Sequence, residues 1–327
     1  MTAIDPTAER NARAHQYSQE GRGDLAIPLF EEVLADRVRV LGTDHPDTLA
    51  SRNNLAGAYW SAGRVGEAIP LFEEVLAERV RVLGPDHPDT LASRNNLAVA
   101  YESVGRLGEA ITLFEEVLAD RVCVLGDDHP DTLTSRGNLA YAYRAAGRLG
   151  EAIALFEEVL ADRVRVLGAD HPDTLVSRNN LAYAYESAGR LGEAIPLYEE
   201  VLADRVRVLG DDHPHTLVSR GNLAGAYELA GRLGEAITLY EQVLVDSVRV
   251  LGEDHPHTLA SRGSLAAAYQ AVGRLGEAIP LYEQVLADSL RVLGPDHPST
   301  LASRRNLEAA RRARESGSAS SPETGEA

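Results

Sequence analysis

The chain has 327 residues and a formal net charge of −18, and all 32 of its basic residues are arginine. The absence of lysine excludes enzymes that need a phosphate-binding or Schiff-base lysine, and the acidic charge disfavours nucleic acid and anionic membranes as partners. No apolar run approaches the ~18 residues needed to span a bilayer, and the N-terminus lacks the features of a signal peptide. We therefore expect a cytoplasmic protein without a cofactor.

A block of 42 residues recurs along the chain. The phrase Gly-x-Asp-His-Pro-x-Thr-Leu begins at Gly42 and returns at Gly84, Gly126, Gly168, Gly210, Gly252 and Gly294. Fixed periods of 20–50 residues are typical of solenoids, in which each repeat buries its apolar face against its neighbours. The period therefore predicts one elongated all-α domain over residues 7–314, although the length alone would suggest two domains.

The first half of each repeat predicts a helix. Pro46 suits the first position of a helix, because the N–H that proline lacks would have no partner there. The following apolar and small residues recur at steps of three and four, as on one buried helical face. Gly63 ends this helix. The residues assigned to the buried face are Leu49, Leu55, Ala56, Tyr59 and Ala62.

A second amphipathic helix is expected from about Val65 to the glycine that closes the repeat, Gly84. Pro70 lies early enough in this helix that its missing N–H costs little. No segment alternates with a period of two, so we expect no strands. The residues assigned to the buried face of this helix are Ile69, Phe72, Leu76, Val80 and Leu83.

The two ends of the array resemble caps. In the first helix, Thr7–Glu20, Arg13 stands where the repeats have leucine. In the last, Pro298–Arg314, Glu308 replaces a small residue and Arg311 replaces tyrosine. Polar residues on a face without a further neighbour are what terminal repeats need. We expect residues 1–6 and the Ser-, Gly- and Glu-rich residues 315–327 to be disordered.

The sequence from Asn54 to Phe72 resembles the tetratricopeptide repeat, with its Leu and small residue followed by Tyr, Gly, Ala and an aromatic residue. The usual repeat has about 34 residues; the longer repeat here resembles those of kinesin light chain and its bacterial relatives. The resemblance covers residues 7–314. It implies a right-handed superhelical solenoid of antiparallel helix pairs that acts as a protein-interaction scaffold.

The same resemblance implies that one side of each first helix lines a concave groove. The copies differ most on this side: the position of Gly57 becomes tyrosine in two copies, and the position of Trp60 becomes Glu, Arg or Gln. The asparagine at position 54 recurs, and the family uses it to bind the backbone of an extended peptide, for which an amide has both donors and acceptors. The candidate groove residues are Asn54, Asn96, Asn138, Asn180, Asn222, Tyr141, Tyr183, Trp60, Glu102, Arg144 and Glu186.

The charge of this groove restricts its ligand. The carboxylate clamp of chaperone-binding tetratricopeptide domains needs lysines, which the chain lacks. Arg144 is accompanied by Glu102, Glu186 and Glu228, so the middle and late groove favours a neutral or basic segment. A merely solvated polar face is the alternative interpretation, and the acidic outer face of the second helices is the other candidate for the working surface.

Arginine and histidine recur at fixed positions. Arg52 and its copies lie within the apolar face, so we expect carboxylates or carbonyls around them as a ladder that fixes the register; a ligand-binding role is the alternative. The histidines before each proline are interpreted as helix caps. The two His-Pro-His sequences, at His213 and His255, also admit a metal site but lack the usual accompanying ligands. Cys123 is the only cysteine, so no intramolecular disulfide is expected.

No set of catalytic residues stands out, and the chain is interpreted as a binding protein rather than an enzyme. The main alternative to a scaffold is a sensor array that acts in trans with a signalling NTPase of the bacterial NB-ARC type. A designed, consensus-like array is a further alternative. The partner is expected to be a protein or peptide; its identity, the pathway and the oligomeric state are left open.

Overall fold

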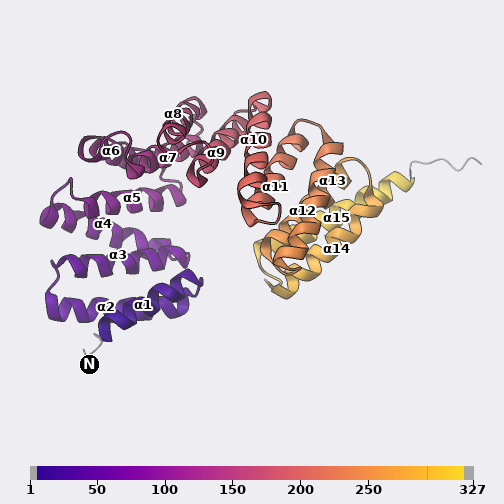
Figure 1. Cartoon of the computed structure of the whole chain (residues 1–327). Coiled ribbons are helices and arrows are strands. Elements are labelled where there is room, and N and C mark those ends of the chain that lie inside the picture. The colour runs from indigo at the N-terminus through magenta and orange to yellow at the C-terminus, as the bar shows by residue number, and fades with distance from the viewer. Residues whose placement is uncertain (1–5, 293, 320–327) are drawn as a thin grey trace, which may run out of the picture. The chain divides into compact units, whose positions relative to one another are not determined.

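The computed structural model describes residues 6–292 and 294–319, and this part of the chain consists of helices joined by short turns, with no strand (Figure 1). First helices of 16 residues such as α3 alternate with second helices of 19 residues such as α4. The predicted all-α class is confirmed. The helices of the described part are α1 (Pro6–Gln19), α2 (Gly23–Leu41), α3 (Pro46–Ser61), α4 (Val65–Leu83), α5 (Pro88–Ser103), α6 (Leu107–Leu125), α7 (Pro130–Ala145), α8 (Leu149–Leu167), α9 (Pro172–Ser187), α10 (Leu191–Leu209), α11 (Pro214–Leu229), α12 (Leu233–Leu251), α13 (Pro256–Ala271), α14 (Leu275–Val292) and α15 (Pro298–Ala319).

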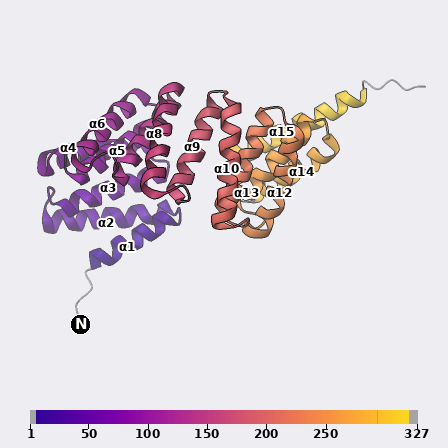
Figure 2. The same cartoon turned by 45° about the horizontal axis from the view of Figure 1, so that its top comes forward.

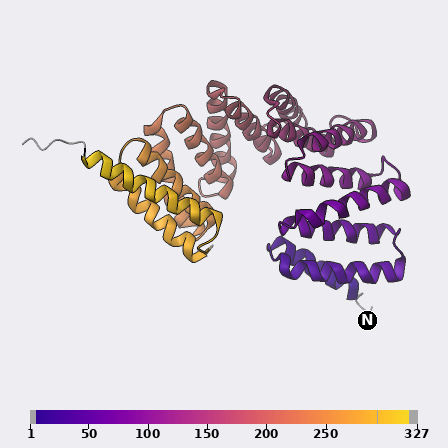
Figure 3. The same ribbon diagram turned by 180° about the vertical axis from the view of Figure 1, so that it is seen from behind.

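The contacts divide the chain into two units, unit 1 (Met1–Val166) and unit 2 (Leu167–Ala327), which are described separately. In unit 1 each helix from α1 to α7 packs against the next, as the layers of α1, α2 and α3 show (Figures 1 and 2). In unit 2 the same holds from α9 to α15, and Figure 3 shows α15, in yellow, alongside α14. The single solenoid expected over residues 7–314 remains a prediction.

Each first helix begins at a histidine and a proline. In α3, the Nδ1 atom of His45 accepts a hydrogen bond from the backbone N–H of Asp47 at 3.2 Å, and Pro46 occupies the first helical position. This bond satisfies one of the N–H groups that have no partner inside the helix. The predicted capping role is confirmed at His45, His87, His129, His171, His213, His255 and His297.

The turn between the two helices of a repeat needs glycine. Gly63 has a φ of 75°, a region that other residues adopt only with strain. In this turn the N–H of Arg64 donates to the carbonyl of Tyr59 at 2.9 Å, and that of Gly63 donates to Trp60 at 3.0 Å. These bonds close the end of α3 so that α4 starts two residues later, at Val65.

The buried face of the second helix differs from the prediction near its end. The buried residues of α4 are Ala68, Phe72, Val75 and Arg79, whereas Val80 is 39% exposed. The prediction for Val80 was wrong, because the helical face continues through Arg79 and this guanidinium finds partners in the next helix. Ala62 of the first helix is also exposed rather than buried.

The arginines of the first helices form the expected ladder. Arg52 of α3 pairs with Glu78 of α4 at 2.8 Å, and Arg136 of α7 pairs with Asp162 of α8 at 2.7 Å. The prediction that carboxylates surround these guanidinium groups is confirmed for Arg52, Arg94, Arg136, Arg178, Arg220 and Arg262. In the last copy Arg304 is exposed.

The terminal helices carry exposed polar residues where inner copies are apolar. Arg13 and Glu308 are exposed. Arg311 replaces the usual tyrosine and keeps its contact, since its Nη2 donates to Glu283 at 2.7 Å. Helix α15 continues to Ala319, so the expected disorder does not begin at residue 315. The other expected disordered residues, 1–5 and 320–327, lie outside the described part, and Pro6 begins α1.

Candidate functional site

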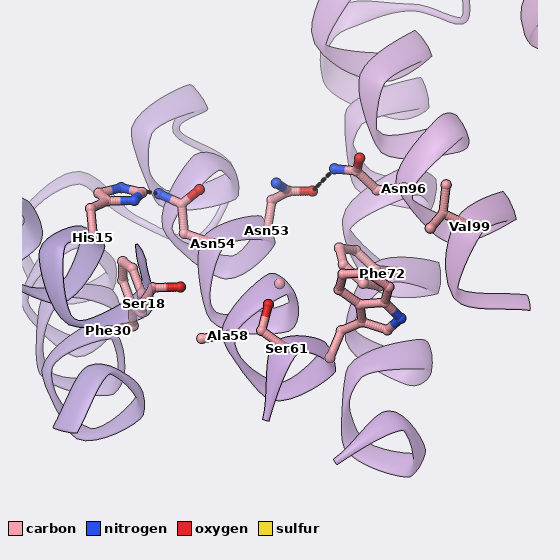
Figure 4. A pocket seen from close by; sticks show the side chains of 12 residues that line it. His15, Ser18, Phe30, Asn53, Asn54, Ala58, Ser61, Phe72, Asn96 and Val99 are labelled. Atoms are coloured by element: carbon pink, nitrogen blue, oxygen red, sulfur yellow. Dashed lines mark hydrogen bonds between the residues drawn. The ribbon is translucent and has the colours of Figure 1, made fainter. Parts of the chain in front are cut away.

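Asparagines link the first helices of each unit to one another. In unit 1 the Nδ2 atom of Asn96 (α5) donates to the Oδ1 atom of Asn53 (α3) at 3.3 Å, and Asn54 contacts the Nε2 atom of His15 (α1) at 3.2 Å (Figure 4). The same link joins Asn138 to Asn95 at 2.9 Å, and in unit 2 it joins Asn222 to Asn179 at 3.0 Å. We call the surface formed by the odd-numbered helices of a unit its groove face.

These bonds give Asn54, Asn96, Asn138 and Asn222 a structural role, whereas Asn180 has Gly137 where its partner asparagine would stand. Each link uses one N–H of one amide and one oxygen lone pair of the other, whereas an amide has two N–H groups and two lone pairs. Asn54, Asn96, Asn138, Asn180 and Asn222 are all half-buried. Their contact with a ligand remains a prediction, and an alanine replacement would also weaken the packing between helices.

The groove face of unit 1 contains a hollow of about 330 Å³. Its walls come from α1, α3 and α5, and Phe30 and Phe72 of the second helices also line it (Figure 4). Trp60 also lines it, is 39% exposed, and donates from Nε1 to the hydroxyl of Ser103 at 3.3 Å. The hollow therefore offers aromatic and amide surface without a carboxylate.

Further along unit 1 the structure brings Glu102, Tyr141 and Arg144 together. The Tyr141 ring packs edge-on against Phe156 with 5.2 Å between centroids, and burial raises the pKa of Tyr141. The Arg144 guanidinium lies 5.9 Å from the centre of that ring. Burial raises the pKa of Glu102, and the charge of Arg144 acts against this shift. This cluster therefore contains one carboxylate, Glu102, and one guanidinium, Arg144.

The groove face of unit 2 contains a hollow of about 400 Å³ with a different lining. Tyr183, which is 43% exposed, and Asn222 contribute to it with two carboxylates, Glu186 and Glu228. Burial raises the pKa of Glu186, opposed by a hydrogen bond from Tyr198. Of the predicted site residues in unit 2, Tyr183, Glu186 and Asn222 therefore meet in one place.

Tyrosines of the second helices reach these carboxylates, and the sequence reasoning missed them. The hydroxyl of Tyr240 (α12) donates to the Oε2 atom of Glu228 at 3.0 Å. Burial and the charges of Glu228 and Glu186 raise the pKa of Tyr240, so both acids lie near this phenol. The signal was present in the sequence: this position is phenylalanine in the earlier copies and tyrosine in the later ones, Phe30, Phe72, Phe114, Phe156, Tyr198, Tyr240 and Tyr282.

A second arginine ladder also escaped the sequence reasoning. The Nη1 atom of Arg79 (α4) donates to the carbonyl of Asp89 and to the hydroxyl of Ser93 in the next first helix, both at 2.8 Å. Burial lowers the pKa of Arg79. The same pair of bonds is made by Arg37, Arg121 and Arg205.

The remaining expectations concern metals, thiols and membranes. Among the described residues no group of three or more His, Cys, Asp or Glu side chains is placed to hold a metal ion. The rings of His213 and His215 stack with 5.3 Å between centroids, while His213 serves as a helix cap. Cys123 is exposed. None of the helices in the described ranges is both apolar and long enough to cross a membrane.

Comparison with known families agrees with this architecture. A tetratricopeptide repeat model matches residues 6–77, 62–121, 121–163, 138–205 and 189–244, and a second tetratricopeptide repeat model matches residues 258–299. The chain belongs to the tetratricopeptide repeat family. No curated protein matches it at a significant level.

Solved structures identify the variety of tetratricopeptide repeat that the chain resembles. Two structures of the nearly identical repeats of a putative kinesin light chain from Podosopora anserina are 37% and 40% identical, with TM-scores of 0.57 and 0.56. They cover 63% of this chain and 98% and 97% of theirs. The expected resemblance to kinesin light chain repeats is confirmed.

More distant structures show the fold alone. BtubC (BKLC) from P. vanneervenii is 18% identical with a TM-score of 0.56, over 80% of this chain and 96% of its own. A signal transduction ATPase with numerous domains and a tetratricopeptide repeat sensor, from Pyrococcus horikoshii, is 15% identical with a TM-score of 0.62. The match covers 88% of this chain and 41% of that one.

Proposed function

We propose that this tetratricopeptide repeat protein is an interaction scaffold whose groove face binds an extended segment of a partner protein. Repeat solenoids generally present extended surfaces to protein partners. A sensor array that acts in trans with a signalling NTPase would engage its partner through the same surface, so the proposal covers this alternative as well.

The location of the differences between repeats carries the proposal. The buried positions are nearly constant, as at Leu55, Leu97, Leu139, Leu181, Leu223 and Leu265. The positions of Gly57 and Trp60 vary between copies, and they line the hollows on the groove faces. Variation at hollows, on a constant core, is what a binding surface with a particular ligand requires.

The two hollows favour different parts of a ligand. Unit 1 offers Trp60, Phe30 and asparagine amides, which suit an apolar side chain and a peptide backbone. Unit 2 offers two partly buried carboxylates, Glu186 and Glu228, in an acidic protein. A basic side chain would offset the cost of burying these charges. We therefore propose that the hollow of unit 1 takes a neutral part of the ligand and that the hollow of unit 2 takes a basic part.

Peptides selected from a random phage-displayed library against the full chain provide the test. We expect the groove variant Trp60→Ala with Tyr183→Ala to weaken binding of a selected peptide at least about tenfold, because aromatic anchors dominate interfaces. The matched control is Val40→Ala with Val245→Ala, two side chains of second helices that are 69% and 66% exposed. Isothermal titration gives both affinities.

The opposite pattern would overturn the proposal. If the Val40 and Val245 variant loses the peptide while the Trp60 and Tyr183 variant binds normally, the outer face is the working surface. Melting temperatures of both variants accompany the titrations, so that a folding defect is distinguished from a lost contact.

A further inference from the structure

The second arginine ladder is interrupted near the end of unit 2. The positions that correspond to Arg79 and Arg205 become serine in the last two second helices, Ser247 in α12 and Ser289 in α14. Serine is too short to reach across to the next helix as the arginines do. Each replacement therefore removes a buried side chain from between two first helices.

At the first interruption another side chain takes the space. The Nδ1 atom of His257 (α13) lies 3.1 Å from the hydroxyl of Ser247. Burial lowers the pKa of His257, as expected for an imidazole that enters the helix interface in its neutral form. His257 stands where most copies have aspartate, so this copy has a substitute for the missing arginine.

At the second interruption a cavity remains. It has a volume of about 340 Å³ and lies between α13, α14 and α15. Ser289, Ser299 and Ser303 contribute hydroxyls, and Leu259 and Val285 contribute apolar wall. Leu259 is 8% exposed against 0% for Leu217 in the preceding repeat, and Val285 is 7% exposed against 1% for Val243.

The groups that receive arginine elsewhere are retained around this cavity. In the first repeat Arg37 donates to the carbonyl of Asp47 and to the hydroxyl of Ser51, which itself donates to that carbonyl at 3.1 Å. In α15 the hydroxyl of Ser303 donates to the carbonyl of Ser299 at 2.8 Å, in the same arrangement. The acceptor pair is present and its arginine is missing.

We propose that this cavity, the serine socket (Leu259, Val285, Ser289, Ser299 and Ser303), binds an arginine side chain of a bound polypeptide. The inference rests on the proposed groove function and adds a site to it. The guanidinium donates to the Ser299 carbonyl and the Ser303 hydroxyl, as the ladder arginines do in cis. Its alkyl stem packs on Leu259 and Val285. Arginine suits such a site because its methylene groups can pack on apolar side chains while its guanidinium makes hydrogen bonds.

A small-molecule probe tests the socket without a partner. n-Propylguanidinium reproduces the arginine side chain, and n-propylurea is its neutral analogue. In titrations of the full chain followed by amide NMR, we expect saturable shifts around Ser289 and Ser303 with propylguanidinium and at least tenfold weaker binding of propylurea. Equal binding of the two compounds, or shifts that do not saturate, would overturn the proposal.

Two variants complete the experiment. Ser289→Arg supplies the side chain in cis, and we expect it to raise the melting temperature and to abolish probe binding. Ser247→Arg is the matched control, because His257 already fills that position; it should give no rise in melting temperature and keep probe binding. A Ser289→Arg protein that melts lower than wild type, or that still binds the probe, contradicts the socket. If these results support the serine socket while selected peptides bind the Trp60→Ala with Tyr183→Ala variant as tightly as wild type, the groove proposal alone fails.

Discussion

The hollows of the two units are built on the same backbone plan but differ in chemistry. Beneath the groove face, unit 1 places Phe72 and Phe114, which are 4% and 0% exposed. Unit 2 places Tyr198 and Tyr240 there, which are 1% and 6% exposed. The added hydroxyls remain buried because Glu186 and Glu228 accept their hydrogen bonds. Tyrosine hydroxyls below and carboxylates on the groove face thus change the chemistry of the unit 2 hollow, while the aromatic rings stay buried.

The two units also differ in the second arginine ladder. In unit 1, Arg37, Arg79 and Arg121 each bridge a second helix to the next first helix. In unit 2 the ladder stops after Arg205, and the last repeat has a cavity in its place. The opening in the last repeat follows from Ser289 in place of the arginine, together with Ser299 where the preceding repeat has His257 to fill the space.

The largest loss of stability is expected when the serine found in the last repeats replaces a ladder arginine of unit 1. Arg79→Ser removes two hydrogen bonds and leaves a void, so we expect a loss of ~2–4 kcal/mol in stability. Arg81→Ser is the control on the same helix: its side chain is 59% exposed and pairs with Asp44 in water, where solvent screening makes the contact weak. Urea denaturation compares the two variants. If Arg79→Ser costs no more than Arg81→Ser, the ladder does not hold the helices together.

A smaller effect is expected from exchanging the buried aromatic residues. Tyr240→Phe removes the hydrogen bond to Glu228 and should cost ~0.5–1.5 kcal/mol, because the buried carboxylate loses a donor. The converse change, Phe114→Tyr, places a hydroxyl below Glu102 and should alter stability by less than about 0.5 kcal/mol, because the new bond offsets the burial of the hydroxyl. Thermal unfolding monitored by circular dichroism measures both. A stabilising Tyr240→Phe would show that the phenol and carboxylate pair is not favourable.

Local chemistry explains why much of the fold was predictable. Pro46 and Gly63 fix the ends of α3 through their own backbone preferences, which do not depend on distant residues. Val80 was assigned incorrectly and the buried position of Arg79 was missed, because periodicity alone does not show that a guanidinium will find a carbonyl in the next helix. The phenols of Tyr198 and Tyr240 were missed because, as core residues, phenylalanine and tyrosine look alike until the acceptor of the hydroxyl is known.

The side of the first helices that carries the candidate residues was predictable, but the bonds these residues make were not. The sequence indicated the side of the first helix on which Trp60 and Tyr183 lie, and both residues line hollows there. It did not show that Asn96 is bonded to Asn53, because that contact joins residues of different repeats. The amides therefore have a packing role that the variation between copies does not reveal.

The central claim is that the groove face, and not the outer face, contacts the partner. A photoreactive benzoylphenylalanine in place of Leu229 or Val245 tests it directly, because these residues are similarly exposed, at 63% and 66%, and lie on α11 and α12 of the same unit. With a peptide selected against the full chain, we expect crosslinking from position 229 and none from position 245. Crosslinking from position 245 alone would contradict the account.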